Sequence, residues 1–248
     1  MGYLCVFKIW LQNYQPKHYN RMSFLWKSSI GRKLIMSITG TALVLFLLFH
    51  MAMNLVAVFS RDGYNMVVEF LGANWYALIG TLGLVALIGI HFLYAFWLSW
   101  QNFRARGMQR YAQKKSPGVT WASKNMLVIG IIVICGLLVH LFNFWAKMQL
   151  VEVLGHHENS LGLPPTDGYA LIERLFANPL YCVIYLVWFA ALWFHLSHGV
   201  WSAVQTIGWN NQIWEKRIKA ISYIVATLIF LGFAFVVVFF YLKSLGLF

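Results

Sequence analysis

Charged side chains are scarce in this chain. Asp, Glu, Lys and Arg make up 10% of its 248 residues, against roughly 25% in an ordinary soluble domain. Hydrophobic residues make up 60% of the sequence, and its mean hydropathy is +0.67. This composition excludes a typical water-soluble domain and predicts a protein embedded in the lipid bilayer.

Cysteine is also rare. The three cysteines, Cys5, Cys135 and Cys182, lie far apart, and the chain has no C-x-x-C pair and no C-x-x-C-H motif. Covalent attachment of a c-type haem and binding of a cysteine-held iron–sulfur cluster both depend on such spacings. The sequence therefore disfavours both groups, and we expect the cysteines to be buried, inert thiols.

Asp, Glu, Lys and Arg are absent from five apolar stretches, each long enough to cross a hydrocarbon core, which takes about 20 helical residues. The expected spans are residues 34–59, 75–100, 126–146, 180–205 and 221–242. We therefore predict an all-α integral membrane fold, with five transmembrane helices in one domain over residues 32–248. Residues 1–31 are expected to form a cytoplasmic or interfacial tail, because their start lacks the small-residue cleavage site of a signal peptide.

Acidic residues are few, seven against nineteen Lys and Arg, and the two signs are distributed unevenly. Fifteen of the nineteen basic residues fall in the N-terminal tail and in the second and fourth connections. Six of the seven acids fall in the first and third connections. Because basic loops stay on the cytoplasmic side, we expect a cytoplasmic N-terminus and an outer C-terminus. The net charge of +12 then implies no nucleic-acid partner.

Histidines, unlike the charged residues, do occur inside the spans, as His50, His91, His140, His195 and His198. Ionisable groups inside a bilayer are costly, so they are functional candidates by default. For any single histidine, a neutral ring hydrogen-bonded between two helices is as good an interpretation as a ligand. Their positions along the helices are therefore more informative than their presence.

The depth of each histidine follows from its distance to the span ends, at about 1.5 Å per residue. His50 and His140 lie on the first and third helices, which run outward, and both are nearer the outer end. His91 and His195 lie on the second and fourth helices, which run inward, and both fall at or below the middle. Four helices thus supply one outer pair and one inner pair.

Paired histidines at two depths favour haem over zinc. Two imidazoles from facing helices can bind the two axial positions of a haem iron and form an electron-transfer site. A structural zinc site would need four ligands at one depth, and a catalytic site would need three ligands and a water. His195 and His198 lie on one helix face, and their spacing leaves open which of them binds the inner iron.

Two stretches resemble a known family, the membrane-anchor cytochrome b subunits of succinate dehydrogenases and fumarate reductases, in the form with five helices and two haems. S-I-T-G-T-A-L-V-L-F-L-L-F-H-M-A-M-N-L, residues 37–55, is similar to their first helix. H-L-S-H-G-V-W-S-A-V-Q-T-I-G, residues 195–208, is similar to the end of their fourth span. Helix order, loop charge and the positions of His91 and His140 match as well, so the resemblance covers nearly all of the chain from Met22 onward.

The resemblance implies two haem b groups with a defined pairing. By position, His50 and His140 correspond to the ligands of the outer, distal haem iron. His91 and His195 correspond to the ligands of the inner, proximal haem iron. The first histidine of H-L-S-H-G matches the family's ligand because it stands four residues before the glycine, so His198 is expected beside the ligand.

Other side chains are candidates for secondary contacts with the haems. Haem propionates need hydrogen-bond donors, and Ser37, Lys124, Gln205 and His198 lie toward the inner membrane face. Gly136 and three glycines of the second span can let helices or haem rings approach closely, although small residues are common at helix interfaces in general.

The resemblance also implies partners. Such anchors bind two subunits on the cytoplasmic face of the bacterial inner membrane, a flavoprotein with covalent FAD and an iron–sulfur protein, which carry the succinate/fumarate chemistry. The implied function is electron transfer between a membrane quinone, with menaquinone expected, and the iron–sulfur subunit. A dimer of the whole complex is compatible with this assembly.

The family's proton-carrying groups are matched only in part. Two-haem relatives place a carboxylate near the distal haem to handle quinol protons, and Glu69, just before the second span, is the nearest match. A solvated loop acid is the alternative interpretation of Glu69. Some relatives carry a glutamate two residues before the inner ligand as a proton relay, whereas this chain has Trp193.

Two other functions compete with this one. The haem b anchor of a hydrogenase or formate dehydrogenase would need similar buried histidines, and a covalent flavin in a partner subunit distinguishes the two. A transporter with histidines in its translocation path is disfavoured, because the spans contain no acids and no breaks.

Overall fold

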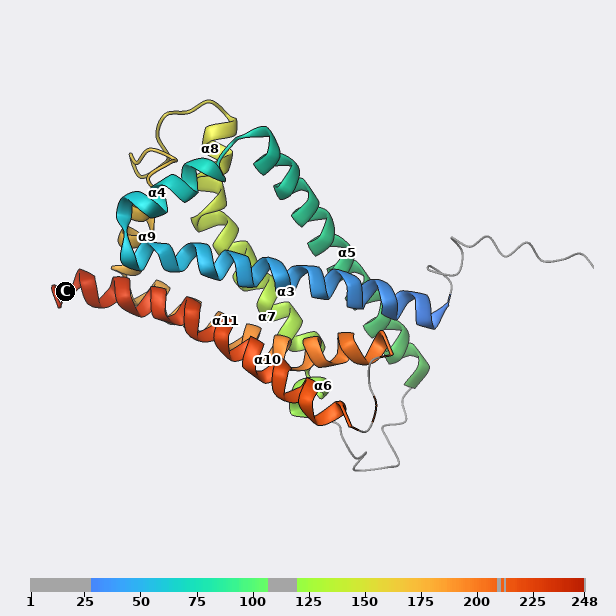
Figure 1. The fold of residues 1–248 in the computed structure, drawn as a ribbon. Coiled ribbons are helices and arrows are strands. Elements are labelled where there is room, and N and C mark those ends of the chain that lie inside the picture. Colours follow the sequence, from blue (N-terminus) through green and yellow to red (C-terminus); the bar gives the residue numbers. More distant parts are fainter. Residues whose placement is uncertain (1–27, 107–119, 209–210, 212, 248) are drawn as a thin grey trace, which may run out of the picture.

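The computed structural model describes residues 28–106, 120–208, 211 and 213–247. The predicted interfacial tail up to residue 27, with Cys5, and most of the second connection lie outside these residues. Every regular element that is described is a helix, and five helices are long and apolar enough to cross a membrane (Figure 1). The predicted all-α fold with five spans is confirmed.

Four of the five spanning helices are longer than the apolar stretches that predicted them, and α7 ends three residues earlier than its stretch. The five are α3 (Ser29–Phe59), α5 (Trp75–Arg106), α7 (Met126–Asn143), α10 (Pro179–Thr206) and α11 (Glu215–Ser244). Two of their starts are set by caps rather than by hydropathy. The Ser28 hydroxyl accepts a hydrogen bond from the Gly31 N–H at 2.9 Å, and Asn178 Oδ1 accepts one from the Leu180 N–H at 2.9 Å.

The connections contain short helices that hydropathy did not predict. These are α4 (Arg61–Phe70), α6 (Trp121–Lys124), the 3₁₀ turn η1 (Trp145–Lys147), α8 (Gln149–Val153) and α9 (Gly168–Phe176). The connection over residues 147–178 is therefore partly helical. The reason is that α9 buries an apolar face, including Leu171 and Ile172, against the bundle.

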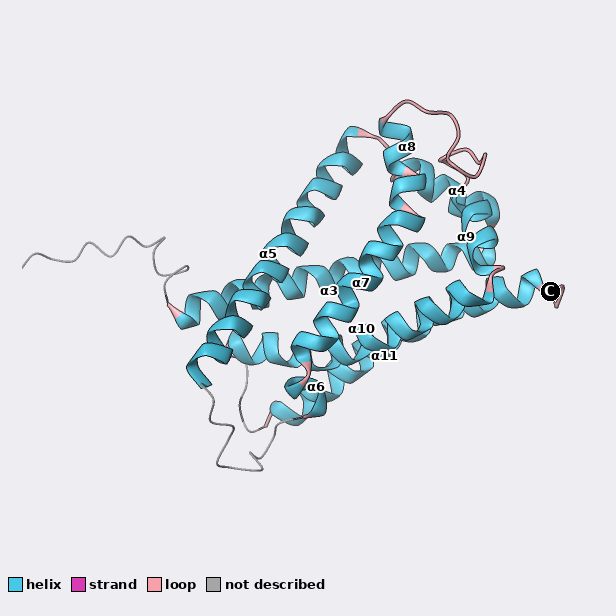
Figure 2. Cartoon of the chain, turned by 180° about the vertical axis from the view of Figure 1, so that it is seen from behind, coloured by secondary structure: helices cyan, strands magenta, loops and turns pink. Residues whose placement is uncertain are grey.

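The bundle has two chemically different ends. In Figures 1 and 2, α4, α8 and α9 gather at the end where the chain reaches its C-terminus, whereas α6 lies at the opposite end. We call the first the acidic end, because the six acids of the first and third connections lie there. The opposite, basic end carries the described basic residues Arg32, Lys33, Arg104, Lys124, Lys216, Arg217 and Lys219.

The core of the bundle lies between α3, α9, α10 and α11. Helices α10 and α11 pack along each other, and α3 packs against both of them. Phe240, Ile229 and Val237 of α11 are fully enclosed there. Helix α5 packs mainly on α3.

The cysteine prediction holds for one of the two described cysteines. Cys182 is buried, and its thiol donates to the Phe176 carbonyl oxygen at 3.2 Å. Cys135 is exposed, contrary to the prediction. It belongs to a stripe of exposed apolar residues on α7 that includes Ile131 and Leu138. A helix face turned toward lipid needs no protein cover, so an apolar thiol is stable there.

Asp167 clamps the connections at the acidic end. Its carboxylate caps α9 by accepting the Ala170 N–H at 3.1 Å, and it also accepts hydrogen bonds from Arg61 Nη2 at 2.8 Å and Asn65 Nδ2 at 2.9 Å. Partial burial alone would raise the pKa of Asp167, but these donors together lower it. The clamp therefore joins α4 to α9.

We expect Asp167→Ala to destabilise the acidic end by about 0.5–2 kcal/mol, the usual cost of losing a helix N-cap. Because the pKa of Asp167 is lowered by folding, its contribution is complete above the ordinary aspartate pKa of about 3.9 and is lost as pH falls through the lowered value. Hydrogen exchange of α9 amides against pH measures this loss. Glu158→Ala, in the exposed loop, is the control, and equal exchange in both variants would contradict the clamp.

Candidate functional site

The predicted outer histidines face each other. His50 of α3 and His140 of α7 have ring centroids 5.8 Å apart, and their planes are nearly perpendicular at 84°. His140 lies three residues before the end of α7 at Asn143, and His50 lies in the half of α3 nearer Phe59. The pair is therefore on the side of the acidic end.

The predicted inner histidines also face each other. His91 of α5 and His195 of α10 have ring centroids 6.3 Å apart, with an angle of 70° between the ring planes. His91 is at the middle of its helix, and His195 is nearer the basic end of α10. The four histidines thus meet in the two pairs that their depths predicted, while their binding of haem stays a prediction.

Each pair is spaced to hold one metal ion between its rings. A metal–imidazole bond of about 2 Å and a ring radius of roughly 1.2 Å place two axial ring centroids about 6.4 Å apart. The observed separations are 5.8 and 6.3 Å. Each pair therefore offers two imidazoles at about the spacing of two axial ligands.

One nitrogen of the inner pair needs a partner. Nδ1 of His195 is the only buried side-chain nitrogen or oxygen among the described residues that has no hydrogen bond. An unsatisfied polar group of this kind costs about 1–3 kcal/mol. Coordination or hydrogen bonding to a bound group would remove that cost, so the residues of this pair fit a haem.

Aromatic rings surround the outer pair. Phe46 stacks on His50 with centroids 5.3 Å apart, and Phe144 and Trp188 lie 5.2 and 5.7 Å from the His140 ring. Both imidazoles are half-buried among these rings. A flat apolar macrocycle would find matching surfaces here.

Asn54 connects the outer pair to α4. Its Nδ2 donates to the His50 carbonyl oxygen at 2.8 Å and lies 3.4 Å from His50 Nε2. Tyr64 of α4 donates its hydroxyl to Asn54 Oδ1 at 3.4 Å. Burial raises the pKa of Tyr64, so this hydroxyl keeps its proton at neutral pH. Asn54 therefore links the turn of α3 that carries His50 to α4, the helix that also carries Glu69.

Gly136 makes room for Trp188. A Cβ atom at Gly136 would overlap the indole ring, whose Nε1 donates to the Val133 carbonyl oxygen at 2.9 Å. The predicted close approach is confirmed at Gly136. At the glycines of α5, a Cβ atom added at Gly80, Gly83 or Gly89 would have no protein atom within 4 Å, so approach of a haem ring there stays a prediction.

The propionate candidates lie toward the basic end. Ser37 is buried, and its hydroxyl donates to the Lys33 carbonyl oxygen at 3.0 Å, within its own helix. Lys124 and Gln205 are exposed, and His198 is half-buried one turn beyond His195. The structure thus leaves Lys124 and Gln205 accessible, whereas the Ser37 proton is already used.

Arg32 is a basic-end residue that the sequence did not single out as part of a site. Its Nη1 donates to Gln101 Oε1 at 2.8 Å, which joins α3 to α5. The contact is between residues 69 positions apart in sequence, so no local motif reveals it.

Glu69 lines a cavity of about 400 Å³ at the acidic end. The lining residues are Met66, Glu69, Phe70, Asn74, Tyr76 and Glu152. The cavity is open to the surface, because five of its six lining side chains are exposed. The cavity combines two carboxylates with apolar side chains, so it can accept the polar head of a largely apolar molecule.

Glu152 is the second acid of this cavity, and no sequence motif assigned it a role. It lies one turn after Gln149, whose side chain bonds to the Gly72 carbonyl, Thr81 and Trp145, each at 2.9 Å. These bonds fix α8 against the start of α5. Glu152 also lies against Gly72, where an added Cβ atom would come within 2.5 Å of its carboxylate.

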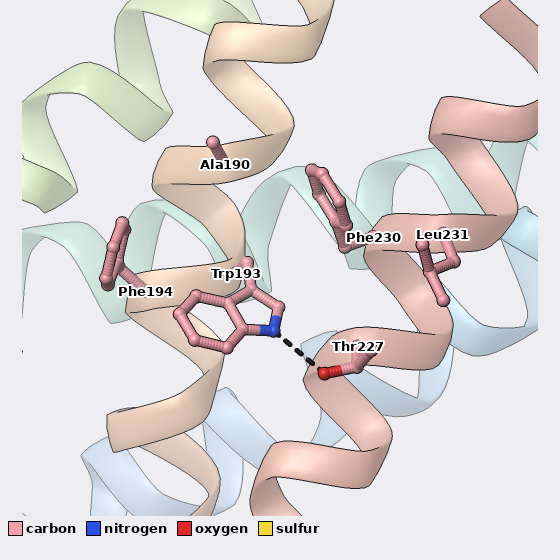
Figure 3. A pocket seen from close by; sticks show the side chains of 6 residues that line it. All are labelled: Ala190, Trp193, Phe194, Thr227, Phe230 and Leu231. Atoms are coloured by element: carbon pink, nitrogen blue, oxygen red, sulfur yellow. Dashed lines mark hydrogen bonds between the residues drawn. The ribbon is translucent and has the colours of Figure 1, made fainter. Parts of the chain in front are cut away.

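Trp193 lies two residues before His195 on α10. Figure 3 shows its indole between α10 and α11, where Nε1 donates to Thr227 Oγ1 at 3.0 Å. The cavity of about 300 Å³ beside it is lined otherwise by apolar side chains such as Phe194 and Phe230. Its lining carries no acid.

Comparisons with known proteins identify no relative. No family model matches the chain, and neither a curated protein nor a solved structure matches it.

Proposed function

We propose that this chain is the membrane anchor and dihaem cytochrome b subunit of a succinate:quinone or quinol:fumarate oxidoreductase. The observation that carries the proposal is the meeting of His50 with His140 and of His91 with His195, at 5.8 and 6.3 Å between centroids. A haem held by two imidazoles supplies reversible one-electron transfer. Four half-buried histidines in two pairs are what two such groups require.

The two proposed haem sites follow one another in space along the proposed electron path. Thr39 contacts His91 at the inner pair, and His50 belongs to the outer pair, so α3 reaches both sites. These two residues of α3 are eleven positions apart, a rise of about 16 Å. One pair thus serves the acidic end and the other serves the basic end.

The acidic-end cavity is the proposed quinone site, with menaquinone as the expected substrate. Glu69 and Glu152 can take up or release the two protons of a quinol at their carboxylate oxygens. Asn74 and Tyr76 add polar side chains to the same lining. At this end the protons of the quinol would therefore go to the carboxylates, while its electrons would pass toward the inner histidine pair.

The basic end is the proposed docking face for the iron–sulfur subunit and, through it, for the FAD flavoprotein. The described side chains of this end include the seven Lys and Arg residues named above and a single acid, Glu215. Glu215 pairs with Lys219 at 2.6 Å. By the positive-inside rule this end is cytoplasmic. The expected location is the bacterial inner membrane.

A difference spectrum of the purified protein tests this proposal. Reduction should produce a b-type absorption band with two haems per chain. A colourless protein would contradict the proposal and favour a transporter. Copurification of a subunit with covalent flavin supports the succinate/fumarate assignment, whereas a haem-containing complex without flavin would point to the anchor of a hydrogenase or formate dehydrogenase.

We expect Glu69→Gln to slow quinol oxidation by the complex about 10²–10⁴-fold, the usual contribution of a general acid or base. Both haems should remain, because Glu69 lies on α4 and contacts neither histidine pair. Steady-state rates with a soluble quinol, together with a haem count, measure the effect. Glu158→Gln, an exposed loop acid at the same end, is the control, and similar rates in both variants would remove Glu69 from the proposed site.

A further inference from the structure

Thr39 makes a buried polar contact with the inner histidine pair. Its side chain is only 5% exposed, and its Oγ1 lies 3.1 Å from His91 Nδ1. The contact joins α3 to α5 inside the membrane-spanning part of both helices. Hydrogen bonds between spans are costly to break there, because lipid offers no replacement.

The hydroxyl of Thr39 has one proton, and that proton is already committed. Oγ1 lies 2.8 Å from the Ile35 carbonyl oxygen and 3.2 Å from the Met36 carbonyl oxygen, both of which can only accept. Thr39 must therefore accept from His91 when all these contacts are made. His91 then carries its proton on Nδ1, and its Nε2 has a free lone pair.

Gly40 shapes the same contact from the neighbouring position. A Cβ atom at Gly40 would lie 3.3 Å from His91 Cε1 and 3.7 Å from His91 Nδ1. An added methyl group would therefore push the imidazole by a few tenths of an ångström. The absence of a side chain at Gly40 and the hydroxyl of Thr39 fix the ring position together.

We propose that Thr39 and Gly40 are positioning residues for the inner haem: Thr39 fixes the Nδ1–H tautomer of His91, and Gly40 fixes the place of its ring. This inference rests on the proposed function, because it concerns how the chain presents Nε2 of His91 to a haem iron. Ligand histidines in proteins donate their second N–H to such an acceptor, which orients the ring and raises its basicity.

Thr39→Val tests the hydrogen bond, because valine keeps the branched shape and removes the acceptor. We expect the inner haem to dissociate about 10–100-fold more readily, the usual effect of losing a histidine's second hydrogen bond. The midpoint potential of the inner haem should rise, since a less basic imidazole stabilises the oxidised iron less. The outer haem should keep its potential. Thr39→Ser should restore both properties, and Thr41→Val, at an exposed position two residues on, is the matched control.

Gly40→Ala is a second, independent test, because this variant keeps the Thr39 hydroxyl. It replaces the first test if Thr39→Val does not fold. It should shift the potential of the inner haem while leaving the outer haem unchanged. Wild-type inner-haem binding and potential in both variants, in a protein with two haems, would overturn the inference alone. A wild-type protein without haem would instead overturn the proposed function.

Discussion

Replacing His50 or His140 by alanine is expected to remove one haem and leave one haem per chain. The two rings face each other at 5.8 Å, so removing either imidazole takes away one of two axial bonds to the same iron. The remaining haem should have the same potential in both variants. Haem extraction with quantitation measures the number of haems per chain, and a redox titration of the purified protein measures the potential of the remaining haem.

Replacing His91 or His195 by alanine should remove the other haem and leave the one that His50 and His140 hold. His198→Ala is the matched control, because it removes a histidine one turn from His195 on the same helix. It should keep two haems. Loss of a haem in His198→Ala but not in His195→Ala would show that the second histidine of H-L-S-H-G is the ligand.

Gly136→Ala should produce the largest effect of the glycine-to-alanine changes in the described part of the chain. The new methyl must displace Trp188, whose indole donates to the Val133 carbonyl and packs 5.7 Å from the His140 ring. Overpacking of this kind costs about 1–3 kcal/mol and sometimes more. We expect a lower unfolding temperature in detergent and weaker binding of the outer haem, while the inner haem is unaffected.

Gly130→Ala is the matched control for this experiment. Gly130 lies on the same helix, and an added Cβ atom there has nothing within 4 Å. The change should be neutral or slightly stabilising, because alanine has the higher helix propensity. Equal unfolding temperatures for the two variants would contradict the packing of Trp188 against α7.

The fold could be predicted from the sequence because lipid imposes simple rules. A span needs about 20 apolar residues, and charges mark where it ends. The same rules gave the depths of the histidines, and depth paired His50 with His140 and placed His91 beside the histidines of α10, of which the resemblance selected His195. Contacts between residues far apart in sequence usually cannot be predicted from a single sequence. Here they could be, because the direction and rise of each spanning helix give the depth of its residues.

The features that escaped prediction depend on contacts between distant residues. Helix α9 is a short segment, and its apolar face stabilises the helix only when it packs against α10 and α11. Glu152 joins Glu69 only because Gln149 fixes α8 to the Gly72 carbonyl. Hydropathy also gives no information about which side of an apolar helix faces lipid, so Cys135 was wrongly expected to be buried.

Haem counts in two double variants test the central claim most directly. The double variant His50→Ala with His140→Ala disrupts one proposed site, so it should retain one haem per chain. The double variant His50→Ala with His91→Ala removes one ligand from each proposed site, so it should retain none. One haem in the second variant and none in the first would contradict the pairing, and with it the account of two haems held by facing helices.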